Sequence, residues 1–137
     1  MDKSLEIICK DTLLNLWKKY RQDYPFLSKI WLSQRRSKRI TGTSVAYYDA
    51  MTGSITVYID RLCRAFSRRD LVGYCHLRHY DTLRELCERV LLHEIAHAKQ
   101  DKEGRLKDAT ASHAEIEQEA DIWAITAMKE EEALVAA

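Results

Sequence analysis

Residues 82–104 constrain the fold of this chain more than any other stretch. Apolar residues recur there at helical spacing along two adjacent stripes, which together cover a wide arc of a helix. The first stripe comprises Leu83, Leu86, Val90, His93 and His97, and the second comprises Cys87, Leu91, Ile95 and Ala98. The helix is expected to begin at Asp81 or Thr82, with Glu85 completing a capping box from Thr82. Gly104 is expected to end it. A helix that is apolar over so wide an arc predicts a central position in the fold.

Two histidines and a glutamate stand out on this helix. His93 and His97 are four residues apart, so their imidazoles lie on one face, one turn apart, and can reach a single metal ion. Both continue a buried stripe, where an unpaired polar group is costly, and a metal would satisfy both rings. Glu94 lies beside them and could hold and deprotonate a bound water. Zinc suits these groups because its catalytic sites take three protein ligands and keep a position for water. The competing interpretation is a core helix with two hydrogen-bonded histidines.

The next predicted helix offers a third ligand. Ser112 and Glu115 are expected to cap its start. Its apolar face comprises Ile116, Ala120, Trp123, Ala124 and Ala127, and the three alanines would let it approach the first helix closely. Glu117 and Asp121 are four residues apart beside that face, and Glu117 follows His97 by twenty residues.

The two motifs together resemble the gluzincin group of zinc metallopeptidases. The pattern is His93-Glu94-x-x-His97 followed by Glu117-x-x-Ala120-Asp121. The resemblance implies that Glu117 is the third zinc ligand and that Asp121 braces a ligand histidine, His93. It also implies an α+β, zincin-like fold, in which a small sheet with antiparallel pairing packs on a catalytic helix and a following ligand helix.

Residues 117–124 are most similar to the ImmA/IrrE-like metallopeptidases, and the resemblance covers roughly residues 45–128. An apolar, often Pro-containing segment that follows the second helix in those proteins is missing here, so compact, minimal gluzincins resemble the chain equally well. The implied activity is hydrolysis of a peptide bond by a zinc-bound water that Glu94 activates. The ImmA/IrrE-like resemblance further implies a specific regulator protein, such as a repressor, as substrate. A further electrophile is usually needed, and the sequence leaves its identity open among Tyr47, Tyr48, Tyr58, His79 and His113.

Two alternatives to this function stay open. The SprT-like, DNA-associated metalloproteases place a histidine ligand about where His113 follows His97, although the G-H-G-x-x-F context of that histidine is absent. The other alternative is a latent or non-catalytic zinc-binding regulatory protein, with the acidic stretch from Glu130 covering the cleft. Glu94 argues against a purely structural site, which has no need of it.

The first half of the chain predicts the rest of the fold. Residues 3–21 have the apolar period of a helix that packs on the core, and residues 60–71 predict another helix that Asp60 caps. Residues 44–59 predict a β-hairpin that turns at Gly53. The gluzincin resemblance implies that one arm of the hairpin lies at the sheet edge and pairs with substrate, and both arms remain candidates. Residues 29–40 predict a strand followed by a basic cluster of Arg35, Arg36, Lys38 and Arg39.

The length, composition and charge of the chain limit the kinds of protein that it can be. The 137 residues predict a single domain, 1–137, and the composition is that of a folded protein. Residues 1–80 carry 15 Lys or Arg against 7 Asp or Glu, whereas residues 81–137 carry 7 against 14. The acidic half suits a cation, and the basic half could face nucleic acid or an acidic partner.

The four cysteines lack paired spacing, and Cys75-His76-x-x-His79 alone is a weak metal pattern. No signal peptide or membrane span is found, so we expect a cytoplasmic protein with reduced thiols and no membrane partner.

Overall fold

The computed structural model describes residues 3–33, 45–68 and 80–136. Within these residues the chain is α+β, with four α-helices and a small mixed sheet. The elements are α1 (Lys3–Asp23), β1 (Ile30–Ser33), β2 (Ala46–Asp49), β3 (Ser54–Tyr58), α2 (Ile59–Arg68), α3 (Leu83–Lys102), the 3-10 helix η2 (Arg105–Lys107) and α4 (His113–Ala136). The predicted basic cluster at 35–39 and the predicted Cys75, His76 and His79 pattern lie outside the described residues.

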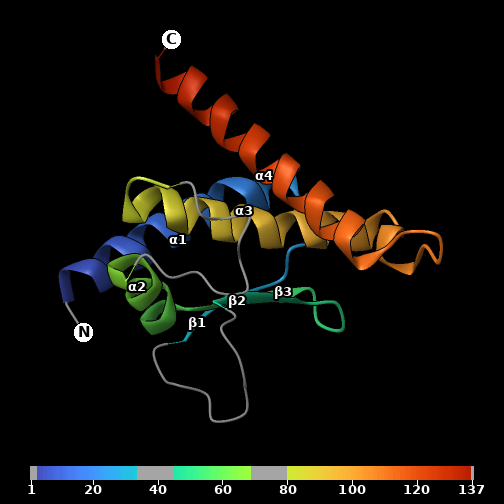
Figure 1. Cartoon of the computed structure of the whole chain (residues 1–137), viewed down its shortest axis with the longest axis horizontal. Coiled ribbons are helices and arrows are strands. Elements are labelled where there is room, and N and C mark those ends of the chain that lie inside the picture. Colours follow the sequence, from blue (N-terminus) through green and yellow to red (C-terminus); the bar gives the residue numbers. More distant parts are fainter. Residues whose placement is uncertain (1–2, 34–44, 69–79, 137) are drawn as a thin grey trace.

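Helix α3 runs through the middle of the fold, as its two apolar stripes predict (Figure 1). Leu86, Leu91 and Ile95 on these stripes are fully buried. The side chain of Thr82 accepts a hydrogen bond from the backbone N–H of Glu85 at 3.1 Å, which confirms the predicted N-terminal cap. Gly104 follows the helix with a φ of 79°, a left-handed conformation that favours glycine and turns the chain.

The hairpin predicted for residues 44–59 is confirmed. Strands β2 and β3 pair antiparallel, and β3 also pairs parallel with β1, which gives the order β1-β3-β2. The turn uses Gly53 at a φ of 70°, and its N–H donates to the carbonyl of Asp49 at 2.8 Å. β2 is therefore the arm of the hairpin at a sheet edge, and it contacts α3. The alternation of side chains gives the sheet two different faces.

The face toward α3 carries Ile30, Leu32, Ala46, Tyr48, Ile55 and Val57. The opposite face carries Trp31, Tyr47 and Thr56, which are aligned across the three strands. Trp31 and Tyr47 are exposed large side chains, whereas Thr56 between them is buried.

The remaining helices complete the core around α3. α1 packs on α3 and α2 through Leu13 and Trp17, so its predicted structural role is confirmed. Cys9, Cys63 and Cys87 are buried free thiols where these three helices meet, in agreement with the prediction. α2 begins at Ile59, so Asp60 lies in its first turn rather than capping it.

α4 crosses α3, and its C-terminal half extends away from the sheet (Figure 1). No described helix has the length and apolar character needed to cross a membrane.

Candidate metal centre

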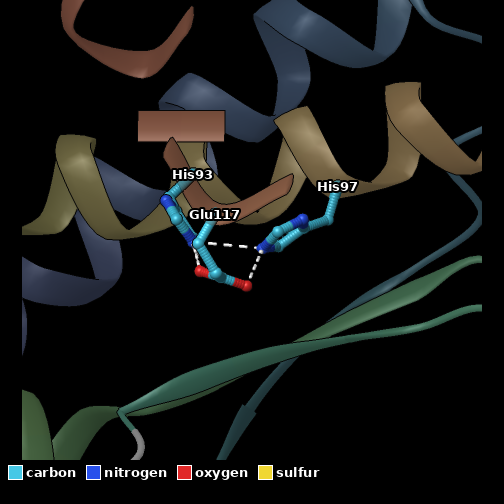
Figure 2. A group of neighbouring side chains, drawn as sticks. All are labelled: His93, His97 and Glu117. Carbon is cyan, nitrogen blue, oxygen red and sulfur yellow. Dashed lines mark hydrogen bonds and ion pairs between the residues drawn. The ribbon is translucent and has the colours of Figure 1, made fainter. Parts of the chain in front are cut away.

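The crossing of α3 and α4 brings together the two histidines and the glutamate of the predicted zinc site. His93 and His97 project from α3 toward the sheet, and Glu117 reaches them from the second turn of α4 (Figure 2). The close crossing depends on small side chains, because Ala120 and Ala124 of α4 are buried. His93 is 1% exposed, His97 is partly buried and Glu117 is open to the cleft on one side.

Three potential ligand atoms converge in this group. Glu117 Oε2 lies 2.9 Å from His93 Nε2, and Glu117 Oε1 lies 3.0 Å from His97 Nε2. The two Nε2 atoms are 3.1 Å apart, and their rings are nearly perpendicular, at 89°. His93, His97 and Glu117 thus form a group that could hold a metal ion.

The donor set fits zinc in both chemistry and spacing. Two imidazole nitrogens and a carboxylate oxygen are ligands found in catalytic zinc sites. Ligand atoms at bonds of about 2.0–2.1 Å around a tetrahedral zinc lie about 3.3 Å apart. The observed separations of 2.9–3.1 Å are close to that value, so small side-chain movements would seat the ion.

Electrostatics in this group favours a cation. The hydrogen bonds from His93 and His97 hold the pKa of Glu117 far below its usual range, so the carboxylate stays ionised. Burial acts to lower the pKa of His97, but the hydrogen bond to Glu117 and the charge of Glu94 outweigh it and the pKa is raised. The carboxylates of Glu94 and Glu117 therefore place negative charge near the point where the three potential ligand atoms converge.

Gln100 fixes the orientation of His97, a role that the sequence analysis missed. The Nδ1–H of His97 donates to Gln100 Oε1 at 2.8 Å, which leaves Nε2 for a metal. The amide Nε2 of Gln100 donates in turn to the carbonyl of Ile116 at 3.0 Å, next to Glu117. The signal in the sequence was the i, i+3 spacing of a polar residue from a ligand histidine.

Asp121 makes a different contact from the predicted brace for His93. Its Oδ1 lies 3.5 Å from Nη2 of Arg89, whose side chain is only 7% exposed. Arg89 precedes His93 by one helical turn, and Asp121 follows Glu117 by one turn, so the ion pair lies beside the metal ligands. A hydrogen bond from the ring N–H of His93 to the carboxylate of Asp121 stays a prediction.

A cleft of about 360 Å³ opens over the three ligands. Glu94 lines this cleft although it is only 3% exposed. The cleft brings together most of the predicted site residues with the edge strand, and its lining comprises Ala46, Tyr47, Tyr48, Ala50, His93, Glu94, His97, Leu106, His113, Ile116 and Glu117.

The candidate electrophiles differ in where the structure places them. Tyr47 borders the cleft from the edge strand, but alternation directs its ring to the face away from α3. Tyr58 is on that same far face, and its ring centroid lies 6.1 Å from that of Tyr47. Tyr48 points toward α3 and donates to Asp101, and His79 lies outside the described residues. His113, in the first turn of α4, is exposed and lines the same cleft.

The C-terminal residues do not lie over this cleft. Residues 130–136 continue α4 away from the sheet, and Glu131 forms an ion pair with Lys19 of α1. In the described residues this acidic stretch therefore does not cover the site, and latency stays a prediction.

A larger cavity of about 570 Å³ lies where α4 and η2 meet the last turns of α3. Its lining includes Trp123 and Arg105, and Arg105 is already paired with Glu119 and Asp108. None of His93, His97 and Glu117 lines this cavity, whereas all three line the smaller cleft.

Comparison of the chain with family models, with curated proteins and with solved structures found no match. The interpretation of the site therefore depends on its geometry and on the spacing of its residues.

Proposed function

We propose that this chain is a zinc-dependent peptidase with a zincin-like arrangement of the gluzincin type. One observation carries the proposal. The ligand atoms of His93, His97 and Glu117 converge beside buried Glu94, in an open cleft that the edge strand β2 borders. A purely structural zinc site needs neither an acid beside its ligands nor an open cleft.

The residues have distinct roles in this proposal. His93, His97 and Glu117 would hold the zinc, which would act as a Lewis acid and would lower the pKa of a water molecule bound to it. Glu94 accepts a proton from the attacking water and returns it to the leaving amine. His113 at the rim is the candidate to hydrogen-bond the developing oxyanion.

The same geometry favours Glu117 over His113 as the third ligand. Both residues line the cleft, but the three-residue group that the structure brings together contains Glu117. This choice argues for the gluzincin interpretation over the SprT-like alternative, with its nucleic-acid partner.

The substrate would be a protein or peptide that binds in extended form. An edge strand can add a further strand by backbone hydrogen bonds, and β2 lies at the sheet edge next to the cleft. The ImmA/IrrE-like resemblance suggests a regulator of the repressor type as the natural substrate.

A peptide library derived from a whole proteome tests the proposal, because it samples many peptide sequences at once. The zinc-loaded full chain is incubated with the library, and new peptide termini are identified by mass spectrometry. We expect the parent to cleave peptides from the library. The rate of cleavage should fall by about 10²-fold or more in Glu94→Gln, because this variant keeps the shape of the side chain but removes the base. New termini at equal rates in the parent and in Glu94→Gln, or none in the parent, would refute the proposed activity.

A further inference from the structure

Tyr48 joins the edge of the sheet to the helix that carries the metal ligands. Its phenol donates a hydrogen bond to Asp101 Oδ2 at 2.7 Å. Asp101 follows His97 by one turn of α3, so the two side chains lie on the same side of that helix. Burial and the hydrogen bond to Asp101 raise the pKa of the Tyr48 phenol, which keeps it in its donor form.

The backbone of Tyr48 also lies where an added strand would pair. In the antiparallel ladder, the N–H of Tyr58 donates to the carbonyl of Val45 at 2.8 Å, so these two residues form a hydrogen-bonded pair. Hydrogen-bonded and non-hydrogen-bonded pairs alternate along such a ladder, so Tyr48 belongs to a non-hydrogen-bonded pair with Ile55. Its N–H and C=O are therefore directed away from β3, toward the sheet edge.

Two adjacent residues in the last turns of α3, Gln100 and Asp101, thus contact different parts of the cleft. Gln100 orients the ligand His97, and Asp101 holds the edge strand through Tyr48. We infer that Tyr48 and Asp101 are positioning residues that set the distance between the metal and the edge at which an extended peptide pairs. The inference builds on the proposed function, because it assigns the way in which the same cleft aligns its substrate. A strand free to shift would pair with a peptide but misplace the scissile bond relative to the metal.

Two hydroxamate probes separate positioning from metal binding. Acetohydroxamate can reach only the metal, whereas a hydroxamate-capped trialanine can reach the metal and also pair with an edge strand. Affinities of both probes are measured by calorimetry on the zinc-loaded full chain. The variants are Tyr48→Phe, which loses the donor, and Asp101→Asn, which keeps an acceptor oxygen. Tyr20→Phe is the matched control, because it also removes a phenol that donates to a carboxylate, that of Glu131, and Tyr20 does not line the cleft.

We expect the peptide probe to bind the parent more tightly than acetohydroxamate does. Tyr48→Phe should lower the affinity for the peptide probe by about tenfold, which corresponds to about 1.4 kcal/mol. The same variant should leave the affinity for acetohydroxamate unchanged. For both probes, the affinity of Asp101→Asn should be closer to that of the parent, and the affinity of Tyr20→Phe should equal it.

Other outcomes overturn specific parts of the inference. An equal loss of affinity for both probes in Tyr48→Phe would show that the substitution disturbs the whole site rather than the position of the edge strand. Unchanged affinity for both probes in Tyr48→Phe would refute the positioning role of Tyr48. A peptide probe that binds the parent no more tightly than acetohydroxamate does would refute peptide pairing at the edge strand. Failure of acetohydroxamate to bind the zinc-loaded parent would instead contradict the proposed metal site.

Discussion

The Nδ1–H of His97 donates to Gln100 Oε1 at 2.8 Å, and this contact connects the candidate metal ligands to the start of α4. Gln100 also donates to the carbonyl of Ile116, the residue before Glu117. One buried amide therefore selects the tautomer of one ligand and holds the backbone beside another.

Loss of Gln100 should weaken metal binding without removing a ligand. We expect Gln100→Ala to lower zinc affinity by roughly 10–100-fold, the usual effect of removing a partner of a ligand histidine. Gln118→Ala is the matched control, because Gln118 is an exposed glutamine on α4. A zinc titration against a competing chelator measures both. If the two variants bind zinc with equal affinity, Gln100 does not orient His97.

The ion pair between Arg89 and Asp121 predicts an effect on stability. Asp121→Ala would leave a nearly buried guanidinium without this carboxylate, which should reduce the free energy of unfolding by about 1–3 kcal/mol. Asp121→Asn should be milder, because its amide oxygen can still accept a hydrogen bond. Urea denaturation of the metal-free proteins measures the change.

Arg89→Met separates the observed contact from the predicted brace. The Met variant removes the ion pair but leaves the Asp121 carboxylate in place. Zinc affinity should then be similar in Arg89→Met and Asp121→Ala. A much weaker affinity in Asp121→Ala alone would show that Asp121 acts on His93, as the sequence predicts.

Two neighbouring leucines test the structural role of α1. Leu13 is fully buried against the core, whereas Leu14 is 43% exposed. Leu13→Ala should cost about 2–5 kcal/mol of stability, and Leu14→Ala should change it by less than about 0.5 kcal/mol. Chemical denaturation of the two variants and the parent measures these changes in the free energy of unfolding. Equal effects would mean that α1 is not packed on the core as described.

The interaction between His97 and Glu117 should stabilise the metal-free protein most in mildly acidic solution. The lowered pKa of Glu117 gives stability that is present above the usual glutamate value of 4.5 and is lost as the pH falls. The raised pKa of His97 gives stability that is present below the usual value of 6.5 and is lost as the pH rises through the folded pKa. The contribution of this pair should therefore be largest between pH 4.5 and 6.5.

Melting temperatures of the chelator-treated parent and of Glu117→Gln, measured from acidic to mildly alkaline pH, isolate this contribution. The difference between the two proteins should peak inside that interval. A difference that grows steadily into the alkaline range would show that the charged pair does not form.

Features that are local in sequence were predicted well. The cap at Thr82, the turn at Gly53 and the end of α3 at Gly104 each depend on a few adjacent residues. The group of His93, His97 and Glu117 was also predicted, because helical spacing determines two of its members and the resemblance supplied the third.

Contacts between distant elements were harder to predict. Nothing in the sequence pairs Tyr48 with Asp101 or Arg89 with Asp121, since each contact depends on how α3 meets its neighbours. The choice of β2 as the edge strand beside α3 also required the order of the sheet. Tyr58 and Tyr48 were equal candidates in sequence, and only the strand register separates their faces.

The metal content of the purified full chain tests the central claim most directly. Zinc is measured by elemental mass spectrometry after dialysis in the parent and in Glu117→Ala, with His113→Ala as the matched control from the same end of α4. We predict about one zinc per chain in the parent and in His113→Ala, and almost none in Glu117→Ala. A parent without zinc, or zinc that survives in Glu117→Ala but is lost in His113→Ala, would contradict the claim.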